Sequence, residues 1–240
     1  MMENTRGGFS LSVQDARMEV TNAFFRKVYH WMTAGLILTA VAAHAVASSE
    51  TLSAMVYGSG MVFWVLILAE LALVMGISAG IGRISAGTAS LLFIVYSVLN
   101  GVTLSFVLMV YTGQSVFNAF LTTAGMFGVM SVYGLYTRRD LTSWGSFLTM
   151  GLIGLILASV VNLFMRSTRV EFVSSLLGVV IFMGLTAWDT QKLLRIGGEL
   201  DDVEDGDGAH KLAIVGALAL YLDFINLFLY LLRFFGRRSD

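Results

Sequence analysis

Long apolar segments separated by short polar connections dominate this chain. Seven segments of about 17–25 mostly apolar residues stand out, each long enough to cross the hydrocarbon core of a bilayer as a helix. They cover residues 30–48, 60–77, 89–111, 115–136, 145–165, 172–194 and 212–232. The pattern predicts an all-α integral membrane protein with seven transmembrane helices.

The polar stretches divide the chain around these spans. We predict a cytoplasmic N-terminal segment at 1–27, a transmembrane domain at 28–234 with an acidic cytoplasmic loop at 196–210, and a short basic tail at 235–240. The first residues carry charges of both signs and no early apolar core, so no cleavable signal peptide is expected. The first span would then act as the insertion signal.

Composition agrees with a membrane protein and narrows its chemistry. Of the residues, 57% are hydrophobic and only 13% charged, and the mean hydropathy is +0.79, whereas a soluble domain carries about 25% charge. The formal net charge of −1 offers no basic field for nucleic acid. Cysteine is absent, which removes thiolate nucleophiles and Cys-ligated metals. We expect no cofactor, no nucleic-acid partner and no enzymatic activity.

The distribution of Lys and Arg predicts the orientation in the membrane. Ten basic residues are expected on the side of the membrane that holds the N-terminus, and five on the opposite side. Basic residues are retained on the cytoplasmic side, so the N-terminus is expected in the cytoplasm and the C-terminus outside. The basic tail argues weakly the other way, because a re-entrant seventh segment would place it inside.

Ionisable residues within the spans are few, and such residues are costly in lipid and by default mark function. They are Glu70 in the second span, Asp189 late in the sixth and Asp223 in the seventh. If the last two spans form a simple antiparallel hairpin, the two aspartates differ from the same depth by about six residues, or roughly 9 Å. Tilt or an asymmetric loop would absorb that difference, so the two aspartates are expected to be able to meet.

Two interpretations of the aspartates stay open. If they meet, they share a proton, because two like charges cannot both ionise cheaply in a low dielectric, and the pair becomes a pH sensor. Arg83, at the cytoplasmic end of the second span, is then the candidate counter-charge. Alternatively, each aspartate separately bonds backbone or hydroxyl groups for structure. Asn226 belongs to a stripe of small and polar residues along the seventh span. Such a stripe lines either a pore or a bundle interior, and Glu70 is a candidate for the same surroundings.

The acidic segment 199–208 invites comparison with a calcium-binding loop. It carries six carboxylates, but they do not follow the alternating frame of a calcium loop, and no Glu closes the twelfth position. We therefore favour a solvated loop that raises the local cation concentration over a calcium site.

Three segments resemble a known family. They are Asn100-Gly-Val-Thr-Leu-Ser105, Ala187-Trp-Asp-Thr-Gln-Lys192 and Leu220-Tyr-Leu-Asp-Phe-Ile-Asn-Leu-Phe228, and they are similar to the Bax inhibitor-1 (transmembrane Bax-inhibitor-motif) family, with its bacterial and Lifeguard-like branch nearest. The resemblance implies seven helices with the seventh surrounded by the other six. It also implies a pH-sensitive calcium leak governed by an aspartate pair, which matches Asp189 and Asp223. Arg83 and Glu70 match family positions more loosely.

The resemblance and the residues together give the functional prediction. The protein is expected to be a calcium-permeable leak channel, or a Ca²⁺/H⁺ exchanger, of the bacterial plasma membrane, with calcium passing near Asp189 and Asp223 and with lipid, calcium and protons as partners. The alternative is a non-conducting regulator or stress-response adaptor that acts through other membrane proteins. An intramembrane aspartyl protease is disfavoured because no Gly-x-Gly-Asp element is present, and a retinal protein because the seventh span has no lysine.

Overall fold

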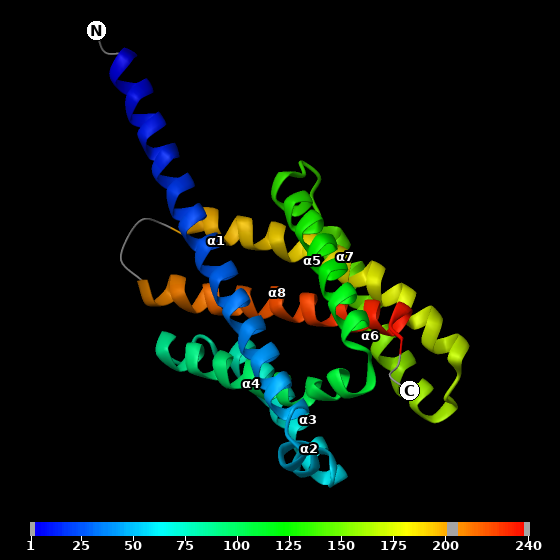
Figure 1. The fold of residues 1–240 in the computed structure, drawn as a ribbon. Coiled ribbons are helices and arrows are strands. Elements are labelled where there is room, and N and C mark those ends of the chain that lie inside the picture. The colour runs from blue at the N-terminus through cyan, green and yellow to red at the C-terminus, as the bar shows by residue number, and fades with distance from the viewer. Residues whose placement is uncertain (1–2, 201–205, 238–240) are drawn as a thin grey trace.

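The computed structural model describes residues 3–200 and 206–237, with side chains from residue 18 onward. Within these residues the fold is built from helices that cross one another at varied angles (Figure 1). They are α1 (Glu3–Ala47), α2 (Glu50–Tyr57), α3 (Gly60–Gly80), α4 (Ala86–Val110), α5 (Gly113–Tyr136), α6 (Thr142–Met165), α7 (Thr168–Glu199) and α8 (Gly206–Phe235).

The prediction of seven membrane spans is confirmed. In the described part of the chain, seven helices are long and apolar enough to cross a membrane, namely α1 from Met18 onward and α3 to α8. The short helix α2 was not predicted, since its eight residues lie in the first connection. The predicted loop at 196–210 is helical at both ends, because α7 continues to Glu199 and α8 begins at Gly206; residues 201–205 lie outside the described residues.

The connections are short because hydroxyl side chains start the next helix at once. Ser85, Thr112 and Ser167 each occupy the N-cap position and accept a hydrogen bond from the backbone N–H three residues on. Such caps satisfy one of the free amides of a first helical turn. Arg166 ends α6 in the left-handed region at φ 46°, so a sharp turn follows before α7.

The last span is the most buried helix of the bundle. In its most apolar stretch 61% of the residues of α8 are buried, against 6% in α3. α8 packs against α1, α4, α5 and α7 and touches α3, while α6 packs against α7. Figure 1 shows α1 and α5 both crossing α8. These contacts support the expected central position of the seventh span and give any polar group on α8 a shielded environment.

Two glycines allow the backbones of neighbouring helices to touch. A Cβ at Gly101 of α4 would lie 2.4 Å from the carbonyl oxygen of Thr39 on α1, and one at Gly134 of α5 would lie 2.4 Å from that of Ala187 on α7. Both distances are too short for any side chain. Small residues at helix crossings are the usual means of close packing in membranes.

Polar contacts group the helix ends into two sets. At one end, Asp207 at the start of α8 accepts a hydrogen bond from the N–H of Ala86 at the start of α4, at 3.2 Å. At the other end, the N–H of Thr112, between α4 and α5, donates to the carbonyl of Arg237 beyond α8, at 3.1 Å. The first end carries the α5–α6 turn as well, and it is the end predicted to face the cytoplasm.

Candidate functional site

The structure brings Asp189 and Asp223 together. α7 and α8 pack side by side, and the two carboxyl groups interact directly between them. Asp223 is only 4% exposed, and its Oδ2 atom accepts no hydrogen bond from the described residues. A buried carboxylate oxygen without a donor is costly, which is why nearly all such atoms in proteins have partners. The pair is therefore a place where a proton or a cation would be strongly stabilised.

A cavity of about 540 Å³ adjoins this pair and gathers polar groups from five helices. Both aspartates line it, and so do the following residues: Glu70 of α3, Tyr96 of α4, Thr149 of α6, and Asn226 and Tyr230 of α8. The rest of the lining is mostly Leu, Ile, Val and Phe side chains. Glu70, the third carboxylate predicted within the spans, thus lines the same cavity as Asp189 and Asp223.

Glu70 faces α4 rather than the outer surface of the bundle. Its carboxylate accepts hydrogen bonds from Asn100 Nδ2 at 3.1 Å and from Thr103 Oγ1 at 2.8 Å. Both donors belong to one of the segments that resemble the family. Two fixed donors hold the Glu70 carboxylate in place, in contrast to Asp223.

The Glu70 contacts continue across the bundle. The hydroxyl of Tyr221, which is fully buried on α8, donates to Asn100 Oδ1 at 2.9 Å and lies 2.6 Å from Thr39 Oγ1 of α1. Glu70, Asn100, Tyr221 and Thr39 therefore form a line of hydrogen bonds that ties α3, α4, α8 and α1 together.

A tyrosine from the short helix α2 interrupts the backbone ladder of α4. The N–H of Phe106 donates to the Tyr57 hydroxyl at 3.0 Å, and that hydroxyl donates to the carbonyl of Val102 at 3.1 Å. A side chain inserted in this way bends a helix that has no proline. This contact was not predicted from the sequence, because Tyr57 lies outside the predicted spans.

Arg83 was predicted as the counter-charge of the aspartates, but no ion pair between them is found among the described residues. Arg83 is exposed on the turn between α3 and α4. The cation that acts electrostatically on Asp189 is Lys192, one turn further along α7. Its Nζ atom lies 5.2 Å from the centre of the Trp188 ring. A lysine three residues after an intramembrane aspartate was a signal that the sequence carried.

Asn226 lies one turn beyond Asp223 on α8 and lines the cavity. Its Nδ2 donates to the carbonyl of Leu222 on its own helix at 2.8 Å. The Oδ1 atom of the amide therefore remains to interact with a polar species in the cavity.

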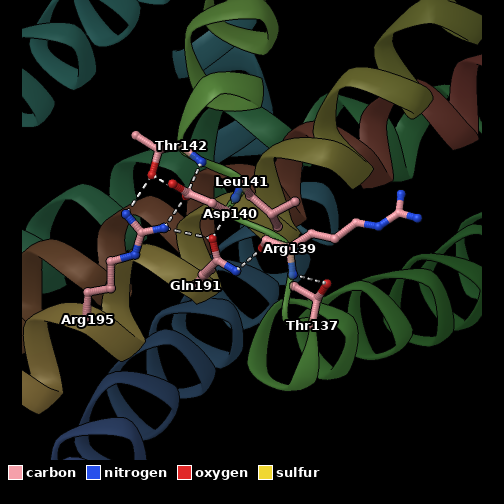
Figure 2. A network of polar contacts seen from close by, with 7 residues as sticks. All are labelled: Thr137, Arg139, Asp140, Leu141, Thr142, Gln191 and Arg195. Atoms are coloured by element: carbon pink, nitrogen blue, oxygen red, sulfur yellow. Dashed lines mark hydrogen bonds and ion pairs between the residues drawn. The ribbon is translucent and has the colours of Figure 1, made fainter.

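A second polar site, which we term the α7 clamp, joins the α5–α6 turn to α7 two residues beyond Asp189 (Figure 2). Gln191 is buried; its Oε1 accepts from the N–H of Leu141 at 2.8 Å, and its Nε2 donates to the carbonyl of Arg139 at 2.9 Å. Arg195 adds hydrogen bonds to Asp140 and Thr142. The α7 clamp comprises Arg139, Asp140, Leu141, Thr142, Gln191 and Arg195.

The exposed carboxylate of the clamp has every partner that it needs. Asp140 accepts from both the hydroxyl and the N–H of Thr142, at 2.6 and 2.9 Å. These hydrogen bonds, with the Arg195 guanidinium as a further cause, lower the pKa of Asp140 to about 2. Gln191 was missed at the sequence level, although an amide so close to an intramembrane aspartate could have marked it.

Among the side chains that the structure describes, no group of three or more His, Asp or Glu residues is arranged to hold a metal ion. The acidic segment that we compared with a calcium loop falls largely on 201–205, outside the described residues.

Comparison with known proteins gives matches along nearly the whole chain. The family model described as "Inhibitor of apoptosis-promoting Bax1" matches residues 21–240. Inner membrane protein YbhL of Escherichia coli K12 is 47% identical over 90% of this chain and 92% of its own. An uncharacterized protein of Borreliella burgdorferi is 46% identical over 96% of this chain and 98% of its own. An uncharacterized membrane protein of Streptococcus pyogenes is 38% identical over 91% and 94%.

Proposed function

The chain belongs to the Bax inhibitor-1 family, and we propose that it is a calcium-permeable leak channel controlled by the protonation of Asp189 and Asp223. The observation that carries the proposal is the buried Asp223 carboxyl group. It interacts with Asp189, its Oδ2 has no donor among the described residues, and it lies beside a cavity lined by a third carboxylate. Oxygen ligands of this kind suit Ca²⁺. Relatives named as membrane proteins support a location in the bacterial inner membrane.

In the proposed mechanism a shared proton closes the channel. Two carboxylates in a low dielectric hold one proton between them more cheaply than they hold two charges. Loss of that proton leaves two negative charges between α7 and α8, and their repulsion favours an arrangement in which the helices separate around the cavity. Ionised Asp189 then interacts with the cations at this end, Lys192 and Arg83. Rising pH therefore increases cation passage.

The proposal includes an orientation. The described basic residues at the end with the α3–α4 and α5–α6 turns include Arg83, Arg138 and Arg139, and basic residues of this kind favour a cytoplasmic location for that end. The aspartate pair would then respond to cytoplasmic pH, because Asp189 lies nearer to that end than to the other.

The test is calcium flux into liposomes that contain the purified full chain, measured over a pH series across neutrality. Flux through the wild type rises with pH. Asp189→Asn and Asp223→Asn each flatten the dependence, and a coupling of about 1.4 kcal/mol between protonation and opening corresponds to an about tenfold loss of pH response. The double variant adds little to either change, because the two residues act as a unit.

Asp140→Asn is the matched control. Asp140 lies at the same end and bonds to the same helix, but it is exposed and outside the cavity, so its variant keeps the wild-type pH profile. A wild-type profile in both pair variants would overturn the sensor assignment. Folded protein that passes no calcium at any pH would instead support a non-conducting regulator.

A further inference from the structure

A second cavity lies on the side of α8 opposite the aspartate pair. It has a volume of about 420 Å³ and is lined by residues of α1, α4, α5 and α8. Its lining is almost wholly apolar, with Phe117 and Phe120 of α5 and Phe224 and Phe228 of α8 as the largest groups. We call it the lateral groove. All four of these helices are candidate membrane spans, so the groove lies at the depth of the bilayer.

The groove occupies the half of the bundle away from the α7 clamp. On α5 it extends from Gly113, the first residue of the helix, to Phe120, which is about 10 Å along the axis. It therefore begins at the membrane boundary, where the α4–α5 turn lies, and reaches toward the middle of the membrane. An apolar groove that begins at the interface and continues toward the middle of the membrane suits the acyl chain of a phospholipid whose headgroup lies at that interface.

A positive charge stands at the interfacial end of the groove. The chain beyond α8 folds over the α4–α5 turn, where the N–H of Thr112 donates to the carbonyl of Arg237 at 3.1 Å and the N–H of Arg237 donates to Ser115 Oγ at 2.9 Å. These bonds fix the backbone of Arg237 beside Gly113 and Val116, which line the groove. The Arg237 side chain is exposed, and guanidinium groups pair well with phosphate.

From this arrangement we propose that the lateral groove binds one acyl chain of an anionic phospholipid, with Arg237 holding its phosphate. The combination of an apolar groove and a backbone-anchored arginine at its interfacial end favours a lipid over a second copy of the chain, for which the charge would have no use. The site is separate from the aspartate pair, so it stands or falls independently of calcium conduction. It does touch the same helix, since Phe224 directly follows Asp223.

Lipid retention by the purified full chain tests the proposal. The protein is equilibrated in detergent with equal amounts of phosphatidylglycerol and phosphatidylcholine, and bound lipids are counted by native mass spectrometry. Wild type retains one phospholipid, preferentially phosphatidylglycerol. Ala40→Phe fills the groove, because Ala40 is exposed and lines it. Displacing about two methylene groups lowers retention about tenfold. Ala45→Phe, exposed on the same helix but outside the groove, retains the lipid.

The headgroup part has its own variants. Arg237→Gln brings retention of the two lipids to parity, whereas Arg233→Gln, whose guanidinium lies 5.6 Å from the Tyr230 ring, keeps the preference for phosphatidylglycerol. Equal retention by wild type and Ala40→Phe, or equal loss in Ala45→Phe, would overturn the groove site. An unchanged preference in Arg237→Gln would overturn the phosphate contact, and a lipid-free dimer would assign the groove to a second copy.

Discussion

Asp140 and Asp223 both interact with residues of α7, but their surroundings are opposite in character. The Asp140 side chain is 71% exposed, accepts hydrogen bonds from Thr142 and forms an ion pair with Arg195 of α7. Asp223 is 4% exposed, has one oxygen without a donor and meets a second carboxylate, Asp189 of α7. Asp140 has hydrogen-bond donors from the protein although it is exposed to water. Asp223 has an oxygen without a donor among the described residues although it is buried.

Under the proposed function, this difference separates a structural site from one that responds to pH. A polar group with all its partners has one preferred arrangement, whereas a buried group that lacks a partner changes its surroundings when a proton or a cation arrives. The α7 clamp acts through Gln191 and Arg195, while the pair uses Asp189, only two residues before Gln191. The α7 clamp thus holds α7 close to the residue that is proposed to respond to pH.

The largest expected effect tests the backbone contact between α5 and α7, which lies close in sequence to both sites. In Gly134→Ala the new Cβ meets the carbonyl of Ala187 on α7 at 2.4 Å, and backbone atoms cannot give way as a flexible side chain can. Overpacking of this kind costs about 1–3 kcal/mol, and we expect the upper end of that range. Thermal unfolding in detergent measures it as a clear decrease in Tm.

Gly128→Ala on the same helix is the control for this change. No atom lies within 4 Å of a Cβ built at Gly128, so the variant is expected to stay within about 0.5 kcal/mol of the wild type. Helix propensity alone favours Ala over Gly at both positions, so equal losses in the two variants would mean that the contact between α5 and α7 is not what excludes a side chain at Gly134.

Gln191→Ala is expected to have the next largest effect. It leaves the N–H of Leu141 and the carbonyl of Arg139 without their partner, and a buried polar group left unpaired costs about 1–3 kcal/mol. The Tm falls, while calcium flux still rises with pH because the aspartate pair is intact. Gln114→Ala, at an exposed site on α5, serves as the control. Loss of the pH response in Gln191→Ala would break the separation between clamp and pair.

The sequence predicted the spans well because their signal is strong and local. Apolar runs of the right length identify membrane helices without any knowledge of neighbours. Helix ends were less predictable, since α7 and α8 continue beyond the apolar run into the predicted loop at 196–210. The helix α2 carries a polar N-terminus and is too short to register as a span, yet it supplies Tyr57 to α4.

The candidate site was predictable only as far as residue type allows. Carboxylates within spans stand out, so Asp189, Asp223 and Glu70 could be found. Their partners depend on how each helix is rotated and which loop folds back, and that information lies in tertiary packing. Gln191 bonds to the backbone of a distant turn, and backbone groups carry no sequence signal. Arg83 was predicted as the counter-charge because it lies at the same end as Asp189 and loosely matches a family position, and neither signal gives the direction of its side chain.

The smallest expected effect is the pH dependence of the clamp carboxylate. Hydrogen bonds from Thr142 and then the charge of Arg195 lower the pKa of Asp140 from 3.8 to about 2. A carboxyl group with a lowered pKa in the folded state stabilises the fold above its unfolded pKa and loses that contribution as the pH falls through the folded value. Asp140→Asn should therefore melt slightly below the wild type at neutral pH, because an exposed ion pair contributes little. The difference in Tm should shrink below pH 3.8 and close near pH 2. A difference that persists unchanged at that pH would show that the shape of the side chain, not its charge, stabilises the turn, and the contrast with the charge-dependent pair would then rest on Asp189 and Asp223 alone.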